Sequence, residues 1–229
     1  MLFRLFLVLK IALLSLCILG LVAWAPAANA ENPKILIVGD SLSAAYGIPQ
    51  QQGWAALLQK KLQLKNYRYD VVNASMSGET TSGGASRINT ALQKTKPTIV
   101  ILELGANDGL RGLPINEMIT NLSNIIRQSK QSGAKVLLIG MQIPPNYGPK
   151  YAEAFSQSYQ RLSQEHKIPL VPFMLKNIAV QPDLIQQDGL HPNALAQPMI
   201  LENIWPQLKL LLKRKILAID AKKPTIKTY

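Results

Sequence analysis

Three residues of this sequence have the types and the spacing that nucleophilic catalysis requires. Ser41 follows a short apolar run, and Asp188 and His191 lie three residues apart in a turn that contains Gly189 and is closed by Pro192. A serine attacks an acyl carbon only when a base removes its proton, and the usual base is a histidine that a carboxylate holds in place. The three residues therefore indicate acyl transfer, provided that the fold brings them together.

Each of these residues also has a simpler interpretation. A serine between a strand and a helix often caps the helix. An Asp-Gly pair often forms an Asx-type turn, in which His191 would be only a surface residue. The other histidine, His166, ends a predicted helical stretch, where a cation is favoured by the helix dipole. We interpret His166 as structural and keep His191 as the candidate base.

An acyl-transfer site also needs hydrogen-bond donors for the oxygen that becomes negative. Gly78 can offer a backbone N–H, and Asn107 can offer a side-chain amide after a close turn at Gly105. Taken singly, a glycine at positive φ or an asparagine in a turn explains each of them equally well. Their joint occurrence with Ser41 and His191 at successive predicted strand ends favours catalysis.

Alternating strands and helices must position these residues. Short β-branched apolar runs predict strands at 34–38, 69–72, 98–104, 135–139 and 169–171, and helical spacing marks stretches around 54–62, 88–92, 115–126, 151–162 and 199–212. Continuous apolar runs indicate strands that are covered on both faces. We therefore expect an α/β fold with a parallel sheet between two helical layers and with the site at the carboxyl ends of the strands.

Composition and charge restrict the class of protein. The 229 residues are 48% hydrophobic and 17% charged, which suits one compact domain with a sizeable core. The net charge is +12, but residues 209–229 hold six of these charges and the first 30 residues hold two. The remaining body is close to neutral, which argues against a nucleic-acid partner. Phosphate-binding loops of the G-x-G-x-x-G and G-x-x-x-x-G-K-[ST] types are absent, as is the G-x-S-x-G elbow.

The amino terminus has the pattern of a secretory signal peptide over residues 1–30. A basic start is followed by the apolar run 11–25, and small residues precede a predicted cleavage site after Ala30. An uncleaved membrane anchor is the alternative interpretation. The lone cysteine, Cys17, lies within the apolar run, so the mature chain would have no thiol nucleophile, disulfide or Cys-rich metal site.

Four stretches resemble the named blocks of the SGNH (GDSL) hydrolase superfamily, in the order and spacing of that superfamily. They are GDSLS at 39–43, NASMSG ending at Gly78, GAND at 105–108 and DGLHP at 188–192. Longer strings, such as GDSLSAAYGIP and DGLHPNALAQP, are similar more narrowly to the bacterial periplasmic arylesterase, acyl-CoA thioesterase I and lysophospholipase group. The resemblance covers residues 34 to about 212, so we expect an SGNH hydrolase domain at 31–212.

The resemblance implies a flavodoxin-like three-layer α/β/α sandwich with a five-stranded parallel sheet. It implies that Ser41 is the nucleophile, that His191 is the base and then the acid, and that Asp188 orients His191. It assigns the oxyanion hole to the Ser41 and Gly78 N–H groups and the Asn107 amide. It also implies a reaction without metal or organic cofactor, on small-molecule acyl esters and thioesters. Together with the signal pattern it implies a periplasmic or secreted enzyme, and we expect a monomer.

The substrate wall is a hypothesis from the residues alone. The segment 109–114 contains two glycines, which permit hinge motion, and two leucines, and we expect it to form a mobile wall of the pocket. In that wall Leu110 would contact an acyl chain, with Ile143, Pro144 and Tyr147 opposite. A plain loop leading into a helix is the alternative. At the level of function, a carbohydrate O-acetyl esterase or a noncatalytic α/β ligand-binding domain remain open.

The basic tail 213–229 also has two interpretations. Its mixture of leucine, isoleucine, lysine and arginine suits an amphipathic segment that contacts an anionic membrane surface weakly. It equally suits the solvated end of the last helix, followed by a frayed terminus.

Overall fold

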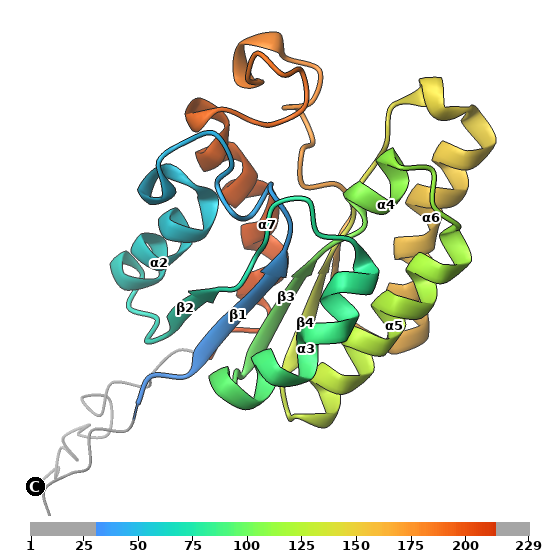
Figure 1. Ribbon diagram of the computed structural model, residues 1–229. Coiled ribbons are helices and arrows are strands. Elements are labelled where there is room, and N and C mark those ends of the chain that lie inside the picture. Colours follow the sequence, from blue (N-terminus) through green and yellow to red (C-terminus); the bar gives the residue numbers. More distant parts are fainter. Residues whose placement is uncertain (1–30, 214–229) are drawn as a thin grey trace, which may run out of the picture. The chain divides into compact units, whose positions relative to one another are not determined.

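The computed structural model describes residues 31–213 (Figure 1). The predicted signal peptide and the tail beyond Lys213 lie outside the described residues. Within the described part of the chain, no helix combines the length and the apolar character that crossing a bilayer would require.

Five parallel strands form a single sheet in the order β2-β1-β3-β4-β5. Their bounds are β1 Lys34–Gly39, β2 Asp70–Asn73, β3 Ile99–Glu103, β4 Lys135–Ile139 and β5 Leu170–Val171. All five residues of β3 are buried, as are the last five of β1, because helices cover both faces of the sheet. The predicted five-stranded parallel sheet is confirmed.

Two helical layers enclose this sheet. Helices α2 (Trp54–Leu64) and α7 (Gln197–Lys209) pack together on one face, and α3 (Thr81–Thr95), α5 (Ile115–Gln131) and α6 (Pro149–His166) cover the other (Figure 1). A short helix, α4 (Ala106–Leu110), and four 3₁₀ turns complete the elements: η1 Gln50–Gln52, η2 Pro145–Tyr147, η3 Pro182–Leu184 and η4 Ala194–Ala196. The predicted three-layer α/β/α sandwich is confirmed.

The periodic apolar residues of each helix face the sheet. In α5, Met118, Leu122, Ile125 and Ile126 are buried at helical spacing. The last helix differs from the expected 199–212: it begins two residues earlier and ends at Lys209. The next residue, Leu210, is 71% exposed, whereas Leu211 and Leu212 still pack against the core outside the helix.

The strand order determines where a site can form. The chain passes from β1 to β2 on one side and then crosses to β3 on the other side of β1. The connections therefore diverge at the carboxyl ends of β1 and β3 and leave a crevice there, which is where open α/β sheets bind ligands. Ser41 follows β1 and Asn107 follows β3.

Candidate active site

The structure brings Ser41, His191 and Asp188 into one hydrogen-bonded line. Ser41 Oγ lies 2.9 Å from His191 Nε2, across 150 residues of sequence. On the other side of the ring, His191 Nδ1 lies 2.6 Å from Asp188 Oδ2. A proton on Nδ1 is donated to the carboxylate, which leaves the Nε2 lone pair directed at the serine hydroxyl. This arrangement can deprotonate Ser41.

The turn from Asp188 to His191 reverses the chain and also fixes the orientation of the His191 imidazole. Asp188 Oδ1 accepts the N–H groups of Leu190 and His191 at 2.9 and 3.0 Å, and Gly189 supplies the positive φ of 70° that the turn needs. The Asx-type turn that was the simpler interpretation is therefore present, and it aims the imidazole at Ser41. These two backbone hydrogen bonds, together with His191 itself, lower the pKa of Asp188 to about 2, so it remains ionised beside the ring.

A second set of contacts joins the histidine loop to the serine loop. The Tyr46 ring lies against His191, with the ring centroids 4.5 Å apart. Gln186 Nε2 donates to the carbonyls of Tyr46 and Pro192 at 2.8 and 3.0 Å, and the Gln186 N–H donates to the His191 carbonyl at 2.7 Å. Tyr46 N–H in turn donates to the Ser41 carbonyl. Sequence reasoning did not identify Gln186, because a glutamine in a loop carries no pattern.

Two backbone N–H groups of residues that line the cavity have no acceptor among the described residues. Neither the Ser41 N–H nor the Gly78 N–H donates to any residue of the range 31–213. Gly78 has a φ of 79°, which favours glycine, and it lines the same cavity as Ser41. Both predicted backbone donors therefore belong to residues that line one cavity.

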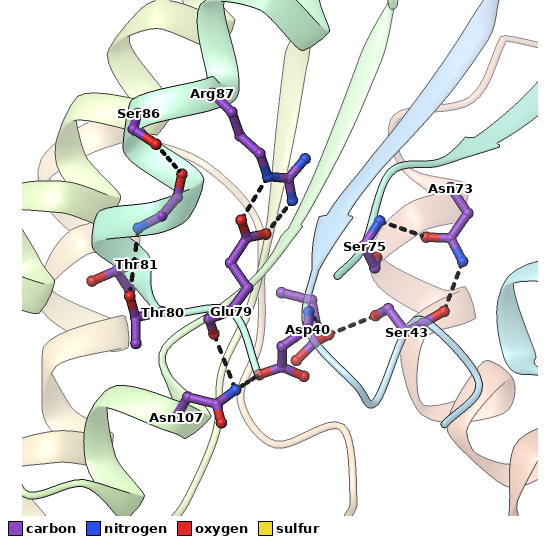
Figure 2. A network of polar contacts seen from close by, with 12 residues as sticks. Asp40, Ser43, Asn73, Ser75, Glu79, Thr80, Thr81, Ser86, Arg87 and Asn107 are labelled. Carbon is purple, nitrogen blue, oxygen red and sulfur yellow. Dashed lines mark hydrogen bonds and ion pairs between the residues drawn. The ribbon is translucent and has the colours of Figure 1, made fainter. Parts of the chain in front are cut away.

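Asn107 reaches the same place from the start of α4. Its Nδ2 donates to Asp40 Oδ2 at 3.2 Å and to the Glu79 carbonyl at 3.0 Å (Figure 2). Glu79 is itself fixed by an ion pair with Arg87 from α3. Gly105 turns the chain with a φ of 117°, and a Cβ there would collide with the Tyr159 hydroxyl. The amide is thus held at the crevice between β1 and β3.

Two carboxyl groups are buried behind the serine. Asp40 Oδ1 accepts the Leu42 N–H at 3.0 Å, while Glu103 Oε2 accepts the Ser43 hydroxyl at 2.6 Å and the Asp40 N–H at 3.3 Å. Burial raises the pKa of Asp40 to about 6, against the effect of the Leu42 hydrogen bond. Burial and the neighbouring Asp40 raise the pKa of Glu103 well above its ordinary value. Ser43 donates to a buried carboxyl group, so its hydroxyl cannot serve as the nucleophile.

Asp108, the last residue of the GAND block, links two elements beside the cavity. It is buried, and its carboxylate accepts the Thr81 N–H and hydroxyl at 2.9 and 2.6 Å. This contact joins the first turn of α3 to α4, and therefore joins the Gly78 loop to Asn107. Asp108 therefore has a structural role, because it links the start of α3 to α4.

A cavity of about 480 Å³ opens beside Ser41. Leu110, Ile143 and Pro144 line it, as expected. An apolar part of the remaining wall comes from the segment between β5 and the histidine loop, with Phe173, Leu175, Ala179, Val180 and Ile185. Sequence reasoning missed this wall because the segment is irregular and has no periodic pattern.

Two expectations about the cavity are wrong. Tyr147 is not among its lining residues; it ends the 3₁₀ turn η2 and is 40% exposed. Gly109 is not a hinge in a loop, because it lies within α4, where a Cβ would collide with Ile143 and Phe155. This glycine permits close packing beneath the cavity wall.

His166 lies apart from the site. It ends α6, as predicted, and its Nε2 is 2.8 Å from the Ser123 hydroxyl. Partial burial lowers its pKa. His191 is therefore the one histidine that can act on Ser41.

Comparison with known proteins agrees with this geometry. Residues 37–197 match the model of the GDSL-like Lipase/Acylhydrolase family. Esterase TesA of Pseudomonas aeruginosa is 49% identical over 184 residues, which are 80% of this chain and 92% of that protein. The thioesterase 1/protease 1/lysophospholipase L1 of Escherichia coli K12 is 42% identical over 180 residues, which are 79% and 85% of the two chains.

A solved structure is similar over the same region. The psychrotrophic esterase EstA from Pseudoalteromonas sp., inhibited by monoethylphosphonate, superposes with a TM-score of 0.75 at 43% identity. The match covers 78% of this chain and 98% of that one.

Proposed function

The chain belongs to the GDSL-like Lipase/Acylhydrolase family and is a carboxylic ester hydrolase of the esterase, thioesterase and lysophospholipase kind, and we propose that Ser41, His191 and Asp188 carry out its reaction. One observation carries the proposal. The Ser41 hydroxyl lies 2.9 Å from an imidazole nitrogen, and the opposite nitrogen of that ring lies 2.6 Å from an ionised carboxylate.

The first half of the reaction forms an acyl-enzyme. Ser41 Oγ attacks the acyl carbon while His191 Nε2 takes the hydroxyl proton, and Asp188 stabilises the imidazolium that results. When the tetrahedral intermediate collapses, the bond to the alcohol or thiol breaks and His191 returns the proton to the leaving group. The acyl group remains as an ester on Ser41.

The negative oxygen of the intermediate is stabilised by three donors. The Ser41 and Gly78 N–H groups have no competing acceptor within the described residues. Asn107 Nδ2 has two acceptors, and we propose that the oxyanion displaces the longer of these contacts, the 3.2 Å one to Asp40. One such donor contributes roughly 3 to 4 kcal/mol to lowering the barrier.

The second half releases the acid. A water molecule takes the place of the leaving group, His191 removes its proton, and the resulting hydroxide attacks the acyl carbon. The same three donors stabilise the second intermediate. His191 then protonates Ser41 Oγ as the carboxylic acid leaves.

The cavity supports substrates with an acyl chain, and we propose aryl esters, acyl-CoA thioesters and lysophospholipids as the substrate classes. Its wall beyond Ser41 is formed largely by aliphatic and aromatic side chains, including Leu110, Ile143 and Leu175. An acetyl group on a sugar needs a shallow polar rim instead of a deep apolar wall. The cavity therefore favours acyl chains over O-acetyl carbohydrates.

A fluorophosphonate probe tests the proposal. It labels a serine only when the hydroxyl is activated, so we expect labelling of the unchanged chain and of Ser43→Ala but none of Ser41→Ala. Ester hydrolysis should fall by about four to six orders of magnitude in Ser41→Ala, as it does when a triad member is removed. Normal turnover in Ser41→Ala would overturn the assignment.

Three further proposals concern the form and location of the enzyme. We propose that residues 1–30 are removed after Ala30 and that the enzyme acts as a monomer in the periplasm or outside the cell. An intact Met1 in the exported protein would contradict the first. The tail 213–229 is proposed to contact anionic membranes weakly, and equal liposome binding without it would dismiss this role.

A further inference from the structure

The exposed apolar side chains of this protein are unevenly distributed. Nine large hydrophobic side chains are exposed within residues 31–213. Seven follow the carboxyl ends of strands: Tyr46 after β1, Met76 after β2, Leu113 after β3, Tyr147 after β4, and Val180, Leu190 and Leu195 after β5. We call these seven side chains the apolar rim. Every strand of the sheet contributes at least one of them.

The opposite edge of the sheet has a different character. The connections there expose lysines, namely Lys65, Lys96, Lys135 and Lys167, while their tyrosines, Tyr67 and Tyr69, are buried. The two remaining exposed hydrophobics, Leu64 and Leu210, lie at the ends of α2 and α7, which run antiparallel to the strands. They therefore face away from the apolar rim. The loops at the carboxyl edge form one group in Figure 1, around the ends of the strands.

The apolar rim is continuous with the cavity at Ser41. Tyr46, Val180 and Leu190 belong to both, since they line the cavity and are 50%, 83% and 44% exposed. Charges beside the rim are mixed in sign: the Arg111 guanidinium donates to the Gly78 carbonyl, and Asp188 pairs with His191. An apolar surface of this kind on a soluble fold marks an interaction site.

We propose that the apolar rim is an interfacial surface, which places the mouth of the cavity against an aggregate of acyl lipid such as a micelle or a bilayer. The inference rests on the proposed function, because an acyl substrate with a long chain resides in such aggregates. When the rim lies on the aggregate, the acyl chain of the substrate passes from the lipid into the cavity without crossing water. The same contact buries the apolar rim. Because the contact is apolar, it does not require anionic lipid.

The test compares two matched pairs of substitutions in the exported protein, from which residues 1–30 have been removed. Met76→Gln with Leu195→Gln removes rim side chains that do not line the cavity. Leu64→Gln with Leu210→Gln removes two side chains that are also more than half exposed but lie at the opposite edge. Binding is measured in a Ser41→Ala background, by sedimentation with phosphatidylcholine vesicles that contain lysophosphatidylcholine. Turnover is measured on soluble p-nitrophenyl butyrate and on micellar lysophosphatidylcholine.

We expect the rim pair to reduce vesicle binding and micellar turnover by about tenfold, with butyrate turnover unchanged, and the control pair to change none of these. Binding should persist at 0.5 M salt, because it does not depend on charge. Equal losses in both pairs, or no loss in the rim pair, would overturn the proposal. Vesicle binding that disappears at high salt, or when residues 214–229 are removed, would also overturn it. The same holds if sedimentation velocity shows a dimer in which a second copy of the chain covers the rim. Absence of butyrate hydrolysis in the unchanged chain would instead contradict the proposed function, since vesicle binding is measured without catalysis.

Discussion

Asp40 and Glu103 are buried directly behind Ser41, and each loses hydration when the chain folds. Glu103 Oε2 accepts two hydrogen bonds, but Oε1 has no partner among the described residues. A buried carboxylate with one unpartnered oxygen is costly when ionised, and protonation relieves that cost. The pKa of Glu103 is accordingly raised well above its ordinary value, by burial first and by Asp40 second.

Stability should therefore fall as the pH rises through the pKa of Glu103. The folded pKa lies above the unfolded one, so the folded state binds the proton more tightly, and this contribution is complete below about pH 4.5 and lost above the folded pKa. Glu103→Gln keeps the acceptor for Ser43 and cannot ionise. We expect the decline in melting temperature between pH 5 and 9 to be smaller in this variant, as measured by calorimetry.

The behaviour of Glu103→Gln and of the unsubstituted protein at acid pH provides a control. Asp188 titrates in the opposite sense, since its pKa of about 2 lies below the unfolded value, and its contribution is lost only as the pH falls toward 2. Both proteins retain Asp188, so they should lose stability in parallel there. Melting curves of the variant and the unchanged chain that also run parallel between pH 5 and 9 would show that Glu103 is not the titrating group.

The sequence predicted the reacting groups better than it predicted the residues that hold those groups in place. Ser41, His191 and Asp188 could be selected because acyl transfer needs those functional groups, and the chain has only two histidines. Glu103 was hidden inside a strand, although a lone carboxylate in an apolar run is itself a signal of a buried, partnered group. Gln186 could not be identified from the sequence, because its role depends on the carbonyls of Tyr46 and Pro192, which only the fold brings close to it.

At the level of elements, the serine loop after β1 and the histidine loop before α7 must keep a fixed separation. Gln186 joins them through its side-chain amide, which bonds Tyr46 O and Pro192 O. Gly47, with a φ of 72°, leaves the space that the Gln186 amide occupies, because a Cβ there would collide with it. Gln186 is thus a positioning residue for the distance between Ser41 and His191.

Gln186→Leu should lower kcat while leaving KM for a short soluble ester unchanged. Loss of both side-chain hydrogen bonds loosens the two loops, and a displacement of about 1 Å at a reacting group can cost roughly 100-fold in rate. The neighbouring Gln187→Leu is the matched control, because Gln187 is exposed. Steady-state kinetics and the rate of fluorophosphonate labelling measure the effect. Equal kcat values in the two variants would exclude a positioning role.

Elements with a periodic pattern were predicted and irregular ones were not. The run 135–139 was placed correctly as β4, and the apolar spacing of 115–126 located most of α5. The five-residue helix α4 was missed because Gly105 and Gly109 suggest a loop, and only packing against Ile143 and Phe155 explains the second glycine. Segment 172–185 has no hydrophobic periodicity, so its contribution to the cavity wall could not be predicted from the sequence.

At the scale of the whole molecule, the cavity forms because of the strand topology, and no single element encloses it. Its wall combines residues that follow all five strands, and these residues meet only because the strands are parallel and end at one edge of the sheet. The family blocks fix the chemistry near Ser41, whereas the depth of the cavity depends on the segment after β5. Acyl-chain preference should therefore be changed from that segment without altering the reaction.

Leu175→Trp and Phe173→Ala should shift chain-length preference in opposite directions. Leu175 is buried and lines the cavity, so a larger ring there shortens the space for the chain, while removal of the Phe173 ring lengthens it. Each methylene that a pocket accepts or rejects changes kcat/KM by roughly 10-fold or more. We expect decanoyl esters to lose at least about tenfold relative to butyryl esters in Leu175→Trp and to gain in Phe173→Ala. Leu64→Trp, at the opposite edge, is the control, and an unchanged preference in both cavity variants would place the acyl chain elsewhere.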